Sequence, residues 1–223
     1  MLGLGCAAMA ATVACSDITS LEQRNPGALS GSTLYTTANA QLIVNGAISD
    51  FECAYARYVV GSGLFTDEFS AAIGNTANFD YDARRVLTNA AYGTNNCGAA
   101  PSSVQQPGIY TPLSTARATG DTAAAYLETW ADAAVPNRTK ILGQSYAYAG
   151  YSVLLLGEGM CTAAINLGPE MQSSQLFSEA KVRFDKAVAA ATTVNDATTL
   201  GFATMSQGTS SMCSMPTDKC TMS

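Results

Sequence analysis

The chain has 223 residues, a formal net charge of −6, 13% charged residues and 48% hydrophobic residues. This length is enough for one sizeable domain, and a charged fraction of about half the usual share indicates an extracytoplasmic or complex-embedded protein with an uncharged polar surface. No stretch gathers Lys or Arg, which excludes nucleic acid as a partner, and the sequence has no histidine, so neither a metal nor another cofactor is expected.

The N-terminal residues 1–15 resemble a bacterial lipoprotein signal. They carry no charge and are too short to span a bilayer, which takes roughly 20 apolar residues. The small and apolar residues 12–14 predict that Cys15 accepts the lipid, with Cys6 as a poorer candidate. A signal peptide normally begins with basic residues, so a retained apolar segment buried against a partner is the alternative interpretation. Both interpretations place the N-terminus at a membrane, and neither decides whether residues 1–14 are removed.

An extended linker at residues 16–35 precedes the first predicted helix. Its Asn25-Pro26-Gly27 and Ser30-Gly31-Ser32 sequences are typical of turns. The helix begins near Thr36 or Thr37, either of which can cap it, and ends at the Gly-Ser-Gly sequence of residues 61–63. Helical spacing is kept by its apolar residues Ala40, Ile43, Ala47, Ile48, Phe51, Tyr55 and Tyr58.

Aromatic and acidic residues mingle from residue 64 to residue 92. A carbohydrate-binding site stacks aromatic side chains on the sugar rings and binds the sugar hydroxyls with carboxylates. The candidate ligand-binding residues are therefore Phe65, Asp67, Phe69, Phe79 and Tyr81. The alternative is that the rings are core and the charges form a solvated rim. Paired carboxylates can cleave a glycosidic bond, but no phosphate loop or Gly-x-Ser-x-Gly elbow occurs. We expect no enzymatic activity.

A long loop and a second helix follow. Residues 92–108 are rich in Asn, Gly, Pro and Ser and include Cys97, which is typical of an interaction surface or a cross-linked cap. Pro112 can open the next helix, which is interrupted by Gly120 and stops at Pro136. Asn137 is then expected to cap the helix after it.

The central prediction is a pair of helices between Arg138 and Ala191. The first is apolar nearly all round, with Leu142, Tyr146, Ala149, Val153 and Leu156 at helical spacing and Gly143, Ala147 and Gly150 along one side. The second has an apolar stripe of Phe177, Ala180, Phe184, Ala187 and Ala191, with Glu179, Lys181, Arg183 and Lys186 away from it. Such a pair is the unit of a helical-repeat fold.

The order Ala180, Phe184, Ala187 matches the second half of a tetratricopeptide-type repeat. The runs 147–161 and 177–187, joined by a short Gly/Pro loop, resemble the helix-pair core of SusD/RagB-like outer-membrane lipoproteins, and residues 15–17 and 25–27 resemble the start of the mature chain in that family. The resemblance implies an all-α fold of tetratricopeptide-like helix pairs with long irregular loops. It also implies a TonB-dependent transporter as partner and a glycan or peptide as ligand, although much of the family's ligand site has no counterpart here.

The predicted helical domain covers residues 36–196. Residues 197–223 are expected to form a loosely packed tail, because the composition turns to Thr, Ser, Gly and Met. With Cys6 removed and Cys15 acylated, an oxidising compartment would leave two disulfides and one thiol. The expected pairs are Cys53 with Cys97 and Cys213 with Cys220, leaving Cys161 as a buried spare; no spacing fits zinc.

Two non-catalytic functions remain. The preferred one is an extrinsic docking subunit of a larger membrane protein complex, such as a respiratory or photosynthetic reaction-centre assembly, held by the lipid anchor on the periplasmic side or at the outer membrane. It fits the short length, the low charge and a tail that needs a partner. The other is a SusD-like glycan- or peptide-binding partner of a TonB-dependent transporter, which the resemblance implies. Fold does not decide between them.

Overall fold

The computed structural model describes residues 31–72, 76–85 and 108–213. Two compact units divide the chain: Met1–Leu34, which holds the short helix α1 (Gly31–Leu34), and Tyr35–Ser223. The second unit contains η1 (Thr37–Asn39), α2 (Ala40–Phe65), α3 (Thr76–Asp82), α5 (Tyr110–Thr129), η3 (Asp132–Ala134), α6 (Arg138–Gly159), β1 (Thr162–Ala164), β2 (Glu170–Gln172), α7 (Ser173–Thr193) and α8 (Ala197–Cys213). The described chain is mostly helical, which confirms the predicted all-α class.

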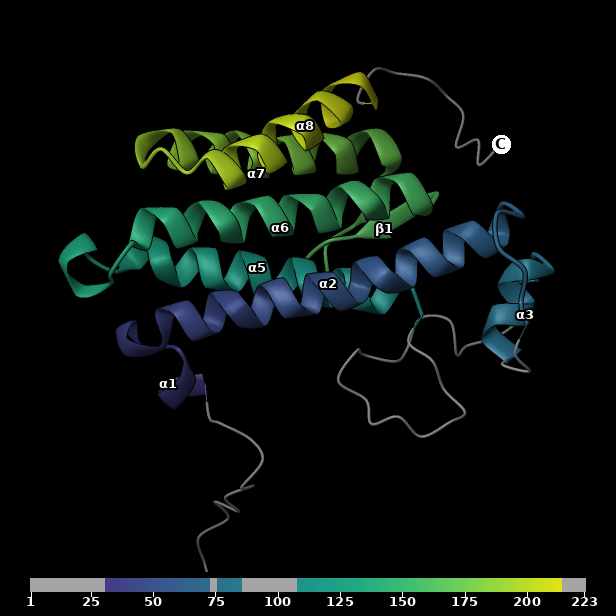
Figure 1. Cartoon of the computed structure of the whole chain (residues 1–223), viewed down its shortest axis with the longest axis horizontal. Coiled ribbons are helices and arrows are strands. Elements are labelled where there is room, and N and C mark those ends of the chain that lie inside the picture. Colours follow the sequence, from purple (N-terminus) through teal and green to yellow (C-terminus); the bar gives the residue numbers. More distant parts are fainter. Residues whose placement is uncertain (1–30, 73–75, 86–107, 214–223) are drawn as a thin grey trace, which may run out of the picture. The chain divides into compact units, whose positions relative to one another are not determined.

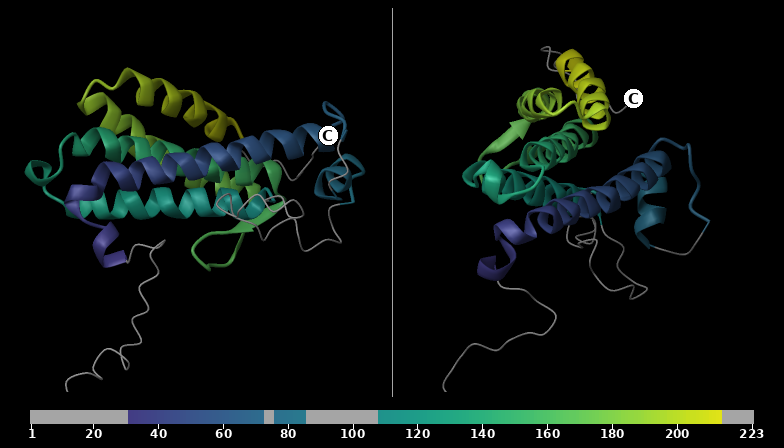
Figure 2. Two further views of the ribbon diagram at one scale, coloured as in Figure 1. Left: turned by 60° about the horizontal axis from the view of Figure 1, so that its bottom comes forward. Right: turned by 60° about the vertical axis from the view of Figure 1, so that its left-hand side comes forward.

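Helix α6 is the centre of the second unit. It packs against α2, α5, α7 and α8, and in Figure 1 α8 lies in front of α7 while α2 lies in front of α5. Figure 2 shows the same stack from two further sides. Helices α2 and α6 run in the same direction, because Phe51 meets Tyr151 and Tyr58 meets Gly159 further along. No helix in the described ranges is long and apolar enough to cross a membrane.

The predicted central pair forms as α6 and α7. Glycines of α6 make room for aromatic rings of α7: a Cβ added to Gly150 would lie 2.9 Å from the ring of Phe184, and one added to Gly157 would lie 2.8 Å from the ring of Phe177. Phe184 is fully buried. Small residues on one helix and rings on the other therefore fix how closely the two helices approach.

A second buried cluster joins the start of α2 to the end of α5 and the start of α6. It consists of Ala40, Val44, Ala123, Leu127, Val135 and Ile141. Helix α5 is continuous through Gly120, where a Cβ would lie 2.9 Å from the Cβ of Ala149. The predicted interruption is therefore wrong: this glycine allows α5 to contact α6.

The ends of two helices differ from the prediction, and a third helix begins where it was predicted. Helix α2 passes the predicted stop at residues 61–63 and ends at Phe65, because Gly61 and Gly63 are covered by the side chains of Ile109 and Phe69. Helix α5 ends at Thr129, before the turn η3, instead of reaching Pro136. Asn137 takes the predicted N-cap position of α6 with φ of 55°, but its side chain forms no capping hydrogen bond.

A short antiparallel hairpin between α6 and α7 was not predicted. Strands β1 and β2 pair in the register Thr162↔Gln172, Ala163↔Met171 and Ala164↔Glu170. Ala163 is buried, and Asn166 and Leu167 of the connecting turn have positive φ angles of 54° and 56°. The hairpin carries Asn166 towards α5, where its side chain takes part in a partly buried polar network described below.

The prediction of a loose tail from residue 197 is wrong for its first part. Residues Ala197–Cys213 form α8, which packs on α7 and α6, and Ala203 is fully buried. Asp196 begins the helix: its carboxylate accepts hydrogen bonds from the hydroxyl and the backbone N–H of Thr199 at 2.7 and 3.5 Å. The tail beyond Cys213 lies outside the described residues.

Candidate functional site

The predicted ligand-binding residues lie near the C-terminal end of α2 and in α3. Phe65 is the last residue of α2, and Asp67 follows with a positive φ of 65°. Asp67 forms an ion pair with Arg84, whose guanidinium carbon lies 6.0 Å from the centre of the Phe65 ring. The structure brings Phe65 and Asp67 together, but it engages the Asp67 carboxylate in the protein's own ion pair.

The other three predicted residues have different environments. The Phe69 ring covers Gly63 and is 48% exposed, and Phe79 of α3 is 43% exposed. Tyr81 instead packs against the main buried cluster, and burial raises the pKa of its phenol while a hydrogen bond from the backbone of Ile109 acts in the opposite direction. Phe69 and Phe79 remain available to a ligand, whereas Tyr81 serves the core, as the alternative interpretation expected.

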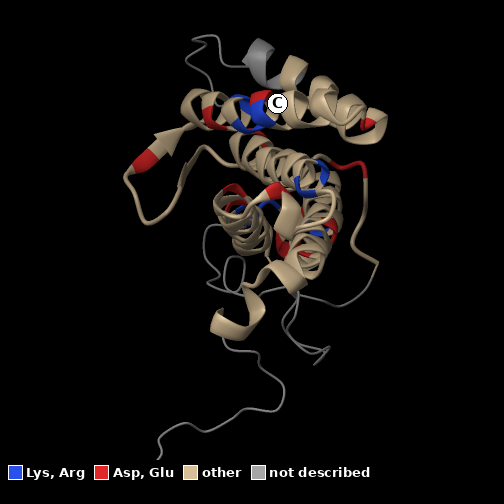
Figure 3. Cartoon of the chain, turned by 90° about the vertical axis from the view of Figure 1, so that its left-hand side faces the viewer, with Lys and Arg blue, Asp and Glu red and all other residues tan. Residues whose placement is uncertain are grey.

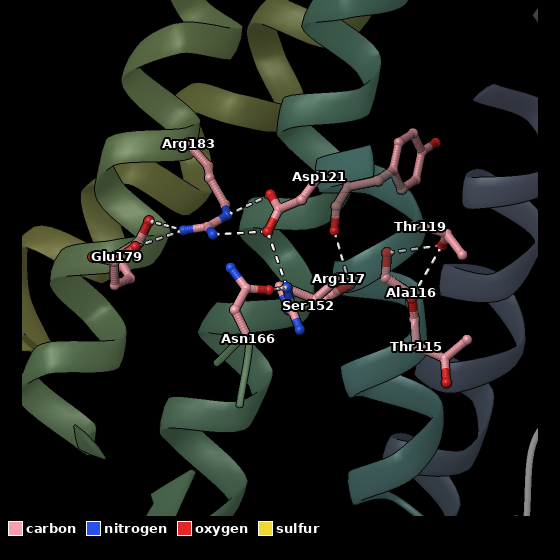
Figure 4. A network of polar contacts seen from close by, with 10 residues as sticks. Thr115, Ala116, Arg117, Thr119, Asp121, Ser152, Asn166, Glu179 and Arg183 are labelled. Carbon is pink, nitrogen blue, oxygen red and sulfur yellow. Dashed lines mark hydrogen bonds and ion pairs between the residues drawn. The ribbon is translucent and has the colours of Figure 1, made fainter. Parts of the chain in front are cut away.

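A partly buried polar network joins α5, α7 and the hairpin turn (Figure 4). Asp121 accepts two hydrogen bonds of 2.8 Å from the guanidinium of Arg183 and one of 3.3 Å from that of Arg117. Arg117, 7% exposed, also donates to Asn166 at 2.5 Å, and Arg183 donates to Glu179 at 2.9 Å.

The charges of this network satisfy one another. Burial acts to lower the pKa of Arg183, but hydrogen bonds to the carboxylates of Asp121 and Glu179 outweigh it and raise the pKa. The guanidinium of Arg183 binds the Asp121 carboxylate in a bidentate arrangement that fixes its geometry, and Arg117 adds a single hydrogen bond to the same carboxylate. We interpret the network as a structural link between helices and not as a binding site.

The feature that the sequence did not predict is a group of rings on three helices, which we call the aromatic face. It consists of Phe51 and Tyr55 of α2, Tyr148 and Tyr151 of α6, and Phe202 of α8. Tyr151 stacks on Phe202 at 5.0 Å between ring centres and meets Tyr55 edge-on at 6.2 Å and 86°. Phe51 is buried beneath them, whereas Tyr55 is 43% exposed.

Two carboxylates accompany the aromatic face. Burial, followed by the charge of Glu158 and a hydrogen bond to it, raises the pKa of Tyr58 to about 12. Burial, followed by the charge of Glu52, raises the pKa of Tyr148. Glu52 and Glu158 are themselves exposed. The only sequence signals were aromatic pairs at helical spacing, namely Phe51 with Tyr55 and Tyr148 with Tyr151, and these cannot show that three helices converge.

A shallow depression of about 340 Å³ follows one side of α5. Its lining is rich in hydroxyl groups and consists of Tyr110, Thr111, Ser114, Thr115, Ala118, Thr119 and Thr122. The Thr119 hydroxyl donates to backbone carbonyls of its own helix, at 3.1 Å to Thr115 and 3.2 Å to Ala116. The lining offers no charge to a ligand, and within the described ranges no group of acidic or cysteine residues could hold a metal ion.

Most of the predicted lipid-attachment and disulfide cysteines lie outside the residues that the structure describes. Cys15, Cys97 and Cys220 are not among the described residues, and Cys213 is the last residue of α8. Cys53 of α2 is disulfide-bonded, and its predicted pairing with Cys97 stays a prediction. Cys161 is exposed and not buried, because α6 ends at Gly159 and the chain leaves the core before it reaches this residue.

In comparisons with known proteins, no family model, no curated protein and no solved structure matches this chain.

Proposed function

We propose that the chain is a non-catalytic, extracytoplasmic scaffold that docks as an extrinsic subunit on a larger membrane protein complex and is anchored through a lipid on Cys15. Its helices α2 with α5 and α6 with α7 form two SusD-like, tetratricopeptide-like pairs, and α8 begins a third. Support for this comes from the parallel course of α2 and α6 and from the glycine and phenylalanine contacts between α6 and α7. Repeat units of this kind bury their faces against neighbours.

The observation that carries the proposal is the outer face of α8, which we define as Gly201, Thr204, Met205 and Gly208. The sequence of α8 contains no charged residue, and Figure 3 shows no blue or red on the part of this helix that it colours. Met205 is 78% exposed, and a Cβ added to Gly201 or Gly208 would meet no atom within 4 Å. A helix face without charge and with an exposed methionine suits burial by a protein partner better than solvent.

The kind of host follows from the lipid anchor and the low surface charge. A respiratory or photosynthetic reaction-centre assembly, whose extrinsic subunits sit at a membrane surface, fits both properties. Packing of α8 on α7 and α6 holds its outer face in a fixed position, because Thr199, Ala203 and Ser206 are buried on the opposite side of the helix.

The test is the size of the assembly that holds the chain after mild detergent extraction from its native membrane. We expect the wild-type chain to elute with a large complex and the variants Met205→Glu and Gly201→Arg to elute as a folded monomer. Val182→Glu on α7 is the matched control, because Val182 is 53% exposed and lies outside the outer face of α8. A wild-type chain that elutes as a monomer would contradict the docking function.

A second candidate is a glycan- or peptide-binding partner of a TonB-dependent transporter. The exposed rings of Phe69 and Phe79 favour it, because carbohydrate rings stack on such side chains. Oligosaccharides should then raise the melting temperature of the wild-type chain and not that of a Phe69→Ala, Phe79→Ala double variant. An equal shift for both proteins would exclude these rings as the glycan site.

A further inference from the structure

We propose that the aromatic face binds a cationic peptide segment, with arginine or lysine side chains placed against Tyr55 and Tyr151 and close to the carboxylates of Glu52 and Glu158. This site is separate from the outer face of α8 and does not depend on the proposed docking function. It is also separate from Phe69 and Phe79.

The rings of the aromatic face are held in place and partly open. Phe51 is 6% exposed and supports the others from beneath, while Tyr148, Tyr151 and Phe202 are half-buried and Tyr55 is 43% exposed. Tyr55 and Tyr151 stand nearly perpendicular to each other. The face of an aromatic ring carries partial negative charge and attracts a guanidinium or ammonium group, most strongly where the ring is already fixed.

Glu52 and Glu158 are the carboxylates beside these rings. Within the part of the chain that the structure describes, neither Glu52 nor Glu158 takes part in an ion pair, and the hydrogen-bond partner of Glu158 is the neutral phenol of Tyr58. Six other carboxylates of the described residues, including Asp67, Asp121 and Asp185, are paired with arginine or lysine side chains of the chain itself. A basic ligand would supply the missing charge, whereas an acidic ligand would be repelled.

The separation of the two carboxylates selects the spacing of the ligand. Because α2 and α6 run in the same direction, Glu158 lies beside Tyr58, six residues after Glu52, which is an offset of about 9 Å along the helices at 1.5 Å per residue. The two carboxylates are on neighbouring helices whose axes lie about 8–10 Å apart, so together the two components separate them by about 13 Å. An extended peptide rises about 3.3 Å per residue. Side chains of an extended peptide alternate between its two faces, so two basic side chains four residues apart, about 13 Å along the peptide, lie on the same side and match the two carboxylates.

The test is the dissociation constant of the full chain for a fluorescently labelled 12-residue probe peptide with two arginines four residues apart in a Gly/Ser background. The same peptide with citrulline in place of arginine keeps the shape and removes the charge. We expect the arginine peptide to bind at least about tenfold more tightly than the citrulline peptide, and added salt to weaken its binding. Equal affinity for both peptides, or no binding to the folded chain, would overturn the proposal.

Variants of the chain place the site on the aromatic face. Tyr55→Ser and the double variant Glu52→Gln, Glu158→Gln should each weaken binding of the arginine peptide by about tenfold. Matched controls are Tyr126→Ser, an exposed tyrosine on α5, and Glu68→Gln, an exposed carboxylate beyond α2, which should change it less than about twofold. Met205→Glu should leave peptide binding intact, so loss of docking and loss of this site are distinguishable. Equal losses in variants and controls would contradict the assignment.

Discussion

Two sides of α6 use aromatic rings in opposite ways. Towards α7, Gly150 and Gly157 receive the rings of Phe184 and Phe177 in a buried contact. Towards α2 and α8, Tyr148 and Tyr151 meet other rings at the surface, with carboxylates nearby. The difference lies in what each ring packs against. A ring that packs on a glycine is covered by the backbone of α6, whereas a ring that packs on another half-exposed ring stays partly open to solvent.

The two arrangements should contribute to different properties. A ring that is buried in a fitted space gains the full transfer free energy and its dispersion contacts, so it stabilises the fold. A half-exposed tyrosine gains only part of that free energy and keeps a surface that a ligand can use. We therefore expect changes on the α7 side to lower the free energy of unfolding and changes on the aromatic face to lower ligand affinity.

The largest effect should come from Phe184→Ala. Phe184 is fully buried between α6 and α7, and its removal leaves a cavity that the backbone cannot close. The free energy of unfolding should fall by about 3–5 kcal/mol in urea titration. Phe79→Ala, which removes a ring that is 43% exposed, is the control and should cost less than about 1 kcal/mol. Similar losses for both variants would contradict the assignment of Phe184 to the core.

Asp121→Asn should have the next largest effect. The substitution keeps the shape of the side chain but leaves the buried guanidinium of Arg117 and the partly buried one of Arg183 without their shared carboxylate. We expect a loss of about 3 kcal/mol. Asp185→Asn removes an exposed carboxylate that pairs with Lys181 and should cost less than about 1 kcal/mol. A neutral Asp121→Asn variant would show that the network does not hold the helices together.

Gly150→Ala tests the close contact between α6 and α7 directly. The new Cβ would lie 2.9 Å from the Phe184 ring, and relief of that clash should cost about 1–3 kcal/mol. Gly46→Ala in α2 is the control: a Cβ there meets no atom within 4 Å, so the higher helix propensity of alanine should stabilise the chain by about 0.5–1 kcal/mol. If both substitutions stabilise the chain, α6 and α7 do not depend on a glycine at this contact.

Asp196→Ala tests α8 and should cost about 1 kcal/mol at neutral pH, because it removes the N-cap of the helix. Hydrogen bonds from Thr199 hold the pKa of Asp196 below its ordinary value. A lowered folded-state pKa means that the stabilisation is present at neutral pH and is lost as the pH falls from the unfolded value, about 3.9, through the folded one. The wild-type and variant unfolding curves should therefore converge in acid, and a gap that persists there would exclude the carboxylate as the cap.

Periodicity predicted the helices that bury an apolar stripe. The α6 and α7 pair could be found because Phe177, Phe184 and Ala191 recur at helical spacing and the small residues of α6 lie on one side. Helix α8 was missed for a physical reason: it has no charged residue, and its Gly, Thr and Ser residues give a weak helical signal, so its packing against α7 decides its structure.

The candidate sites were harder to predict than the helices. Phe65 and Asp67 are close in sequence, and their proximity could be expected. The aromatic face depends on Tyr55, Tyr151 and Phe202, which are far apart in sequence and meet only because α2 and α8 both pack on α6. Likewise, no spacing reveals that Arg117 and Arg183 share the carboxylate of Asp121.

The most direct test of the division between the two sides of α6 is the free energy of unfolding of Tyr55→Ser, measured in urea with and without the arginine peptide. A ligand that binds only the folded state raises this free energy. We predict that without peptide the variant stays within about 1 kcal/mol of the wild-type chain, and that saturating peptide stabilises the wild-type chain but not the variant. A Tyr55→Ser variant that is destabilised as strongly as Phe184→Ala, or stabilised by the peptide as much as the wild-type chain, would contradict this division between the two sides of α6.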